Sequence, residues 1–205
     1  MDRSAIVLAG GFSRRFGRDK GLSQLAYKPL VKHVLDAISP FVNEKIVVVS
    51  SQAQAENYKK ALDSRITVVT DIENKQTPLV GALTGFKEAH GEYSFLLSCD
   101  VPFVSKDVVS LLFELCIGRN AVVPRWPNCY IEPLHAVYCT KPAYEATKNA
   151  LDAQELNMQA MIDKLKCVRY VSTLVLQQLD PELRTFFNIN TPLDLKKAEK
   201  MISHH

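Results

Sequence analysis

The segment LAGGFSRRFGRDK, residues 8–20, follows a short apolar run at the start of the chain and decides how the rest of the sequence is interpreted. Gly10, Gly11 and Gly17 lack a Cβ, which lets backbone N–H groups approach a ligand closely. The arginines and the lysine of the segment attract anions. The segment lacks the Gly-Lys-Ser/Thr ending of a Walker A loop and the spacing of the dinucleotide fingerprint GxGxxG. It therefore predicts a phosphate-binding loop of another kind.

Around this loop, apolar runs with strand character alternate with helical stripes. Runs that are apolar throughout are typical of a parallel sheet covered by helices on both faces. The carboxyl ends of parallel strands meet at one sheet edge, where such folds bind ligands. We expect strands over residues 3–9, 45–49, 66–69, 93–97 and 120–123, and helices over residues 29–38, 53–62, 79–90 and 106–116.

From residue 124 the pattern changes, and we expect a substrate-facing part of the same domain, which spans residues 1–205. Thr191, Pro192 and Asp194 have the order of an N-cap followed by a first helical turn. The expected elements are a loop over 124–128, strands over 133–138 and 167–171, and helices over 142–151, 157–165 and 192–202.

The composition excludes several classes of protein. Hydrophobic residues make up 47% of the 205-residue chain, and the formal net charge is only +3. So small a charge favours neither nucleic acid nor a membrane surface as a partner. Five cysteines without a CxxC pair predict reduced thiols rather than disulfides or zinc ligands. Because the sequence has no signal-peptide pattern and no membrane-spanning apolar run, we expect a cytoplasmic enzyme.

A second chemical signal follows the strand expected over residues 93–97. Asp100 stands in the segment SCDVPF, residues 98–103, and therefore at the same sheet edge as the glycine-rich loop. An acid opposite a phosphate-binding loop is a candidate magnesium ligand, because Mg²⁺ is usually held by one or two carboxylates and by substrate phosphates. Taken alone, Asp100 is also typical of a turn before Pro102, and Lys20 of a solvated surface charge.

Four segments together resemble the molybdenum cofactor guanylyltransferases. LAGGFSRRFGRDKGL resembles their LAGGxSxRMGxDK loop, and TPLVG, residues 77–81, resembles their GPLxG element. SCDVPF resembles their CDxPF, and NINTP, residues 188–192, resembles their NxNTP close. The order is the same and the segments span nearly the whole chain. The first segment is shared with all nucleotidyltransferases of this superfamily, whereas the combination points to this branch.

The resemblance implies a fold and a reaction. The fold is α/β, a three-layer sandwich in which a mostly parallel, Rossmann-like sheet is covered by helices on both faces, as in nucleotide-diphospho-sugar transferases. The implied reaction transfers GMP from GTP to the terminal phosphate of the molybdopterin-molybdenum cofactor, which forms the guanine dinucleotide and pyrophosphate. Magnesium is the implied cofactor, and other molybdenum-cofactor proteins are implied partners. Residues 1–123 would bind the nucleotide and residues 124–205 the acceptor.

The resemblance also implies roles for individual residues. Lys20 would neutralise the nucleotide phosphates, Arg15 would assist as pyrophosphate leaves, and Asp100 would hold magnesium. In-line attack by an acceptor phosphate oxygen needs positioning and charge stabilisation, and no nucleophilic Ser or Cys. The implied binding residues, of which the last two face the pterin, are Leu8, Ala9, Gly10, Gly11, Lys20, Ser50, Asp71, Asp100, Asn188 and Asn190.

Several residues depart from the family pattern. Phe16 replaces a methionine, Thr77 replaces the glycine of GPLxG, and Ser50 stands where some members have asparagine. Gln159 falls where relatives often carry an arginine that could meet an anionic acceptor, and glutamine cannot provide that charge. His135 lies in a segment that resembles an acceptor-side strand, but a buried, hydrogen-bonded histidine is the commoner explanation.

Two alternatives remain open at this stage. The same scaffold could transfer GMP to adenosylcobinamide phosphate, or CMP to molybdopterin or another small phosphate, because base choice rests largely on backbone donors. The chain could also be a nucleotide-binding module without turnover. Lys20, Asp71 and Asp100 weigh against this second alternative, because binding alone does not require the metal-binding acid.

Overall fold

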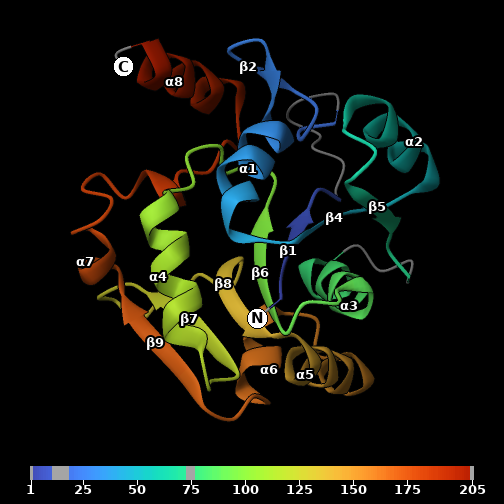
Figure 1. Cartoon of the computed structure of the whole chain (residues 1–205), viewed down its shortest axis with the longest axis vertical. Helices are drawn as coiled ribbons and strands as arrows, with labels where there is room; N and C mark the ends of the chain where they lie inside the picture. The colour runs from blue at the N-terminus through green and yellow to red at the C-terminus, as the bar shows by residue number, and fades with distance from the viewer. Residues whose placement is uncertain (1, 11–18, 73–76, 204–205) are drawn as a thin grey trace.

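The computed structural model describes residues 2–10, 19–72 and 77–203. Within these ranges seven strands form one sheet in the order β5-β4-β1-β6-β8-β7-β9 (Figure 1). Of the seven, β8 runs antiparallel to both its neighbours, so the expected α/β fold with a mostly parallel sheet is confirmed. The strands are β1 (Arg3–Leu8), β4 (Glu44–Val49), β5 (Thr67–Thr70), β6 (Tyr93–Ser98), β7 (Ala121–Arg125), β8 (His135–Cys139) and β9 (Val168–Ser172).

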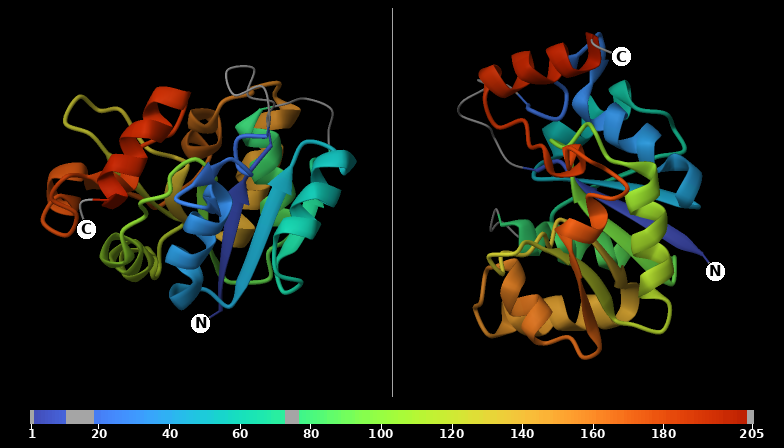
Figure 2. Two further views of the ribbon diagram at one scale, coloured as in Figure 1. Left: turned by 90° about the horizontal axis from the view of Figure 1, so that it is seen from above. Right: turned by 90° about the vertical axis from the view of Figure 1, so that its left-hand side faces the viewer.

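Helices cover both faces of the sheet (Figure 2). The side chains of β1 show why the central strands are apolar throughout: Ala5 and Val7 lie in one core, and Ile6 lies in the other. None of the helices in the described ranges is both long and apolar enough to cross a membrane. The first core is covered by α1 (Leu30–Ile38), α2 (Gln52–Ala61) and α4 (Lys106–Cys116), and the second by α3 (Pro78–Glu88), α5 (Thr140–Asp152) and α6 (Met158–Asp163).

The helices and strands expected from the sequence are confirmed to within two residues at each end. The loop expected over residues 124–128 is wrong at its start, because Pro124 and Arg125 belong to β7. Pairing of β7 with β8 ends at Val122, whereas pairing with β9 continues through Pro124 and Arg125. Proline lacks an N–H and is tolerated where a strand is no longer paired on both sides.

A small hairpin between β1 and α1 is not predicted by the sequence. Its strands are β2 (Gln24–Leu25) and β3 (Lys28–Pro29). The turn residues Ala26 and Tyr27 have φ values of 47° and 64°. Two-residue hairpin turns with positive φ normally use Asn or Gly, so the usual sequence signal is missing here. The short helices η1 (Ser39–Phe41), α7 (Thr173–Leu176) and η2 (Arg184–Phe186) are also absent from the expectation.

The final helix, α8 (Pro192–Ser203), begins as expected. The Asp194 N–H donates to Thr191 Oγ1 at 3.2 Å, and the Thr191 N–H donates to Asp194 Oδ2 at 2.9 Å. This reciprocal capping satisfies N–H groups that have no partner inside the helix. Figure 1 shows α8 beside β2, and a small third core, formed by Leu25, Leu30, Ile189 and Ala198, joins the hairpin to the carboxyl-terminal segment.

The register of the parallel strands positions the site. Leu8 pairs with Ser98 of β6 and with Val48 of β4. The Asp71 N–H donates to the Val49 carbonyl at 2.8 Å, which continues the ladder beyond β5. The residues that follow β1, β4, β5 and β6 therefore emerge at one edge of the sheet, as parallel pairing requires.

Gly85 tests how closely α3 packs on β1. A Cβ at this position would meet Ile6 Cγ2 at 2.2 Å. Helix propensity alone favours alanine over glycine by about 1 kcal/mol. We predict that Gly85→Ala nevertheless lowers the free energy of unfolding by about 1–3 kcal/mol, because it overpacks the core. Urea unfolding measures the change, with Lys87→Ala on the exposed side of α3 as the control. Unchanged or increased stability of Gly85→Ala would contradict this packing.

Candidate functional site

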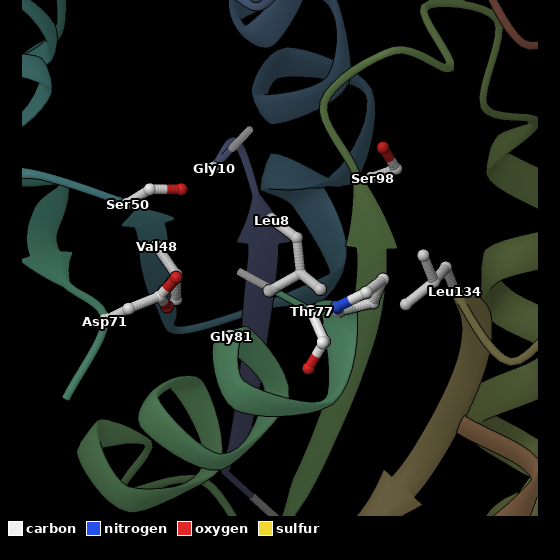
Figure 3. A pocket seen from close by; sticks show the side chains of 10 residues that line it. Leu8, Gly10, Val48, Ser50, Asp71, Thr77, Gly81, Ser98 and Leu134 are labelled. Carbon is white, nitrogen blue, oxygen red and sulfur yellow. The ribbon is translucent and has the colours of Figure 1, made fainter. Parts of the chain in front are cut away.

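A pocket opens at the carboxyl edge of the sheet, beside the ends of the parallel strands (Figure 3). Its volume is about 140 Å³, which is below the range of about 300–1,000 Å³ usual for a drug-sized ligand. The pocket therefore suits one part of a larger ligand, with the remainder extending out of it. Its lining consists of Leu8, Gly10, Val48, Ser50, Asp71, Thr77, Pro78, Gly81, Ser98 and Leu134.

Four residues of the implied nucleotide-binding set lie in this lining: Leu8, Gly10, Ser50 and Asp71. Gly10 and Ser50, at the ends of neighbouring strands, approach each other closely. A Cβ on Gly10 would meet Ser50 Oγ at 2.5 Å and the Ser50 backbone nitrogen at 3.2 Å. A side chain at position 10 would therefore displace the Ser50 hydroxyl and crowd the backbone at Ser50.

The other residues of the glycine-rich loop have different placements. Ala9 is buried, and its N–H donates to the Val48 carbonyl at 2.8 Å. This hydrogen bond joins the start of the loop to β4. Ala9 is not part of the pocket lining. Gly11, Arg15 and Phe16 lie outside the residues that the structure describes, so their implied roles stay predictions.

Asp71 directly follows β5 and is the acid of the pocket lining. Its Oδ1 is buried and has no hydrogen-bond partner among the residues that the structure describes. Burial raises the pKa of the Asp71 carboxyl to about 6, because desolvation disfavours the charged form. An unpartnered carboxylate oxygen facing a pocket is suited to accept hydrogen bonds from N–H or O–H groups of a ligand.

The start of α3 explains the departure at Thr77. Thr77 is the N-cap of α3, its Oγ1 accepts from the Val80 N–H at 3.4 Å, and Pro78 occupies the first helical turn. Threonine caps a helix about as well as glycine does. The TPLVG segment therefore retains the capped helix start at the pocket, and Gly81 lines the pocket one turn further on.

A charged cluster joins three parts of the chain at the same edge. Lys20 Nζ lies 2.5 Å from Asp100 Oδ2 and donates to Asn190 Oδ1 at 3.2 Å. Asp100 is buried, with 6% of its surface exposed. The Ile189 N–H donates to the Asp100 carbonyl at 2.9 Å. Lys20, Asp100 and Asn190, each singled out from the sequence, are thus brought together by direct contacts.

The donor set at Asp100 fits a magnesium ion. Asp100 Oδ1 is buried and has no hydrogen-bond partner in the described part of the chain, although Oδ2 is paired with Lys20. The described residues contain no cluster of three or more His, Cys, Asp or Glu side chains able to hold a metal by themselves. One carboxylate, with the remaining ligands supplied by substrate phosphates and water, is the arrangement that Mg²⁺ commonly accepts.

The remaining acceptor-side residues lie apart from this cluster. Asn188 is exposed, and its Nδ2 donates to the Phe186 carbonyl at 3.1 Å. Gln159 lies on α6, where its Nε2 donates to Asp163 Oδ1 at 2.7 Å. This contact lies on the surface of the helix. The structure therefore brings Asn190, but not Asn188, into contact with Lys20 and Asp100.

His135 is a buried residue of β8. Its ring packs edge-on against Phe186, with centroids 5.2 Å apart. Burial lowers the pKa of His135 to about 4, although the nearby charge of Asp100 opposes this effect. The side chain is consequently neutral at pH 7. Its Nε2 is buried and has no hydrogen-bond partner among the described residues, so a purely structural role for His135 stays a prediction.

The sequence analysis missed three residues that build the site. Ser98 and Leu134 line the pocket; Ser98 lay in the SCDVPF motif and Leu134 in the segment that resembles an acceptor-side strand, but neither was named as a site residue. Asp19 precedes Lys20 in the DK pair, and its carboxylate accepts hydrogen bonds from Tyr58, Gln54 and the Gly21 N–H. The DK pattern in the sequence pointed to Asp19. No pattern pointed to its partners on α2, Gln54 and Tyr58.

The variant Asp71→Asn tests the cost of burying Asp71. The folded-state pKa of about 6 lies above the ordinary value of 3.8, so between these values the folded protein binds more protons than the unfolded chain. The contribution of the Asp71 carboxyl to the free energy of unfolding of the wild-type protein therefore falls as the pH rises through this window. We expect Asp71→Asn to be more stable than wild type by about 1–2 kcal/mol at about pH 7, after allowing for solvent screening.

At about pH 4 the wild-type Asp71 carboxyl is protonated in the folded state, so the advantage of the variant should shrink towards zero. Urea unfolding of both proteins at the two pH values measures this difference. A stability difference that is the same at both values would contradict the assigned pKa shift.

Comparison with known proteins agrees with this geometry. Residues 5–168 match the family described as the MobA-like NTP transferase domain. The chain is 38% identical to a probable molybdenum cofactor guanylyltransferase of Methanosarcina mazei, with 98% of this chain and 91% of the relative covered. It is 35% identical to the protein of the same description from Pyrococcus furiosus, with 96% of each chain covered.

Solved structures support the fold. Molybdopterin-guanine dinucleotide biosynthesis protein A from Archaeoglobus fulgidus matches with a TM-score of 0.83 at 29% identity, covering 98% of this chain and all of that one. A 2-C-methyl-D-erythritol 4-phosphate cytidylyltransferase from Thermus thermophilus, 18% identical, shares the fold with a TM-score of 0.71 and covers 99% of this chain and 100% of its own. Since the family match spans most of the chain and the relatives align along nearly their whole length, the chain belongs to the MobA-like NTP transferases, the family of the molybdenum cofactor guanylyltransferases.

Proposed function

We propose that this protein transfers GMP from GTP to the terminal phosphate of the molybdopterin-molybdenum cofactor, which forms the guanine dinucleotide and releases pyrophosphate. The observation that carries the proposal is the contact of Lys20 with both Asp100 and Asn190 at the sheet edge where the pocket opens. The names of the relatives at 30–38% identity support the choice of donor and acceptor.

The geometry supports one orientation of the nucleotide. The pocket, with Asp71 as the acid of its lining, takes the base and ribose, and the triphosphate extends towards Lys20. Leu8, Gly10 and Ser50 then lie beside the nucleoside. The backbone of Gly10 and the Ser50 hydroxyl are proposed to provide hydrogen bonds to the polar edge of the base. In this orientation the small volume of the pocket is sufficient.

The chemistry requires only one bond exchange. An oxygen of the acceptor phosphate attacks the α-phosphorus of GTP, and the bond from this phosphorus to the bridging oxygen of the β-phosphate breaks. The electron pair of that bond leaves with pyrophosphate. Lys20 neutralises the charge that accumulates on the phosphate oxygens, and such a preorganised cation is a large source of transition-state stabilisation. Arg15 is proposed to assist the departing pyrophosphate.

Asp100 is proposed to hold the magnesium ion through its Oδ1. When bound, magnesium would neutralise and orient the phosphate oxygens around the reacting phosphorus. Cys99, next to Asp100, does not supply a nucleophile: burial raises the pKa of its thiol, which keeps it protonated and inert. The protein therefore acts by positioning and charge stabilisation rather than through a covalent intermediate.

The acceptor is proposed to bind on the side formed by residues 124–205, with Asn190 and, more loosely, Asn188 facing the pterin. A carrier protein of molybdenum-cofactor biosynthesis is the proposed source of the acceptor, and a cytoplasmic location stays a prediction. Because Gln159 provides no positive charge and lies on the surface of α6, acceptor recognition in this chain must rely on other residues than the arginine of its relatives.

The donor and acceptor are tested by one experiment. The purified protein is incubated with magnesium, a molybdopterin-loaded carrier and one of GTP, CTP, ATP or UTP, and pyrophosphate release is measured. We expect release with GTP, and only when the pterin is present. Release with CTP would instead favour cytidylyl transfer. Tight GTP binding by calorimetry without any release would indicate another acceptor phosphate or a module without turnover, and adenosylcobinamide phosphate is the next acceptor to assay.

The variant Asp100→Asn tests the metal assignment. Loss of the carboxylate should lower magnesium-dependent transfer by about 10²–10³-fold, because an electrostatic stabiliser of the transition state is removed. Binding of GTP without metal, measured by calorimetry, should largely survive. Asp107→Asn, at an exposed position in the first turn of α4, serves as the control and should retain the wild-type rate. A wild-type rate for Asp100→Asn would show that Asp100 does not hold the metal.

A further inference from the structure

A chain of hydrogen bonds connects the rim of the pocket to the residue before Lys20. The Ser50 N–H donates to Gln54 Oε1 at 3.0 Å. The Gln54 Nε2 donates to Asp19 Oδ2 at 2.9 Å. The other carboxylate oxygen, Asp19 Oδ1, accepts from the Tyr58 hydroxyl at 2.7 Å and from the Gly21 N–H at 3.1 Å. Asp19 thus accepts three hydrogen bonds, of which two come from side chains of α2.

The direction of this chain is fixed at its first member. The Ser50 atom that contacts Gln54 is the backbone N–H, which can only donate. The Gln54 atom that accepts from it must therefore be the amide oxygen. The amide nitrogen of Gln54 therefore faces Asp19, and position 19 must present an acceptor to it. A carboxylate satisfies all three donors at once, whereas an asparagine would place an N–H against the N–H of Gln54.

The same contacts hold the backbone on both sides of Lys20. A Cβ on Gly21 would meet the Tyr58 hydroxyl oxygen at 2.2 Å, so the chain passes directly over this ring. Tyr58 is fully buried in the core. On the other side, the Ser23 N–H donates to the Lys20 carbonyl at 3.0 Å. These contacts hold the backbone of residues 19 to 23 in place. They therefore fix the Cα position of Lys20 from which its side chain reaches Asp100.

We propose that Asp19 is a positioning residue, whose carboxylate, held by Tyr58 and Gln54, fixes Lys20 for contact with the nucleotide phosphates and couples it to the pocket rim at Ser50. Asp19 acts through Lys20 and does not touch the substrate. The proposal deepens the proposed function and rests on it for its kinetic consequence. The placement of Lys20 beside Asp100 is independent of any activity.

The test exchanges the two polar groups of the chain. Asp19→Asn alone leaves two N–H groups facing each other, and Gln54→Glu alone leaves two carboxylates facing each other. In the double variant Asp19→Asn/Gln54→Glu, the new asparagine amide donates to the new glutamate, which still accepts from the Ser50 N–H. The hydrogen bond between positions 19 and 54 is then restored in the reverse direction, the bonds from Ser50, Tyr58 and Gly21 keep their direction, and the net charge is unchanged. Gln52→Glu, at an exposed position of α2, is the matched control for the glutamate substitution.

The first measurement is spectroscopic and does not depend on turnover. In protein labelled with ¹³C,¹⁵N-lysine, the signal of the Lys20 ammonium is assigned by its absence in Lys20→Met. We expect this signal to shift or broaden in Asp19→Asn and to return towards the wild-type position in the double variant. The second measurement is the rate of GMP transfer. We expect kcat to fall by about 10-fold to 100-fold in Asp19→Asn, with a smaller change in the KM for GTP, and to recover in the double variant.

The outcomes separate the two proposals. An unchanged Lys20 signal in a folded Asp19→Asn variant would overturn the positioning role, whatever the activity. A loss in Asp19→Asn that persists in an equally stable double variant would also overturn it, because the restored hydrogen bonds would then be irrelevant. Absence of transfer by the wild-type protein, together with the expected spectroscopic changes, would refute only the proposed reaction and leave the positioning of Lys20 intact.

Discussion

The ion pair between Lys20 and Asp100 is the interaction on which the charged part of the site depends. It joins the loop after β1 to the end of β6, across 80 residues of sequence, with the two charged atoms 2.5 Å apart. Asp100 is almost fully buried, and removing one partner of a buried pair leaves a charge without compensation. The parallel register of β1 and β6 makes the pair possible, because it places both strand ends at the same edge. Asn190, from the far end of the chain, contacts the same ammonium group.

Hydrogen bonds from two other parts of the fold hold the two residues of this ion pair in place. The loop carrying Lys20 is tied to α2 through the carboxylate of Asp19, and the strand end carrying Asp100 is tied to the carboxyl-terminal segment through the Ile189 N–H. Ile189 itself is buried in the small core beneath α8. The final helix and the unpredicted hairpin therefore contribute to the site, although neither lines the pocket. A preorganised charge of this kind is more effective than one that must be ordered when substrate binds.

The fold could be predicted from the sequence more completely than the contacts within the site. Strands such as β1 and β6 are apolar on both faces because helices cover both, so their runs were visible in the sequence. The hairpin was not visible, since Ala26 and Tyr27 adopt positive φ without the residues that usually signal it. Lys20 and Asp100 could each be singled out from motifs, but their contact depends on tertiary register. The partners of Asp19 on α2 carried no signal at all, because Gln54 and Tyr58 resemble ordinary helix residues until the fold brings them to the loop.

The two acids of the sheet edge differ in a way that bears on how each meets a nucleotide. Burial raises the pKa of the Asp71 carboxyl, and among the described residues no ion pair is formed by Asp71, which suits it to accept a hydrogen bond from a ligand. Asp100 has a lysine on one oxygen, and its second oxygen is buried and has no partner within residues 2–10, 19–72 and 77–203. A lysine ammonium has three donors, and Asp100 and Asn190 already accept two of them. Lys20 in this arrangement thus has one further N–H donor for a ligand anion. The two acids are therefore suited to different parts of a nucleotide: Asp71 to a hydrogen bond in the pocket, and Asp100, beside the lysine, to the neighbourhood of its charged groups.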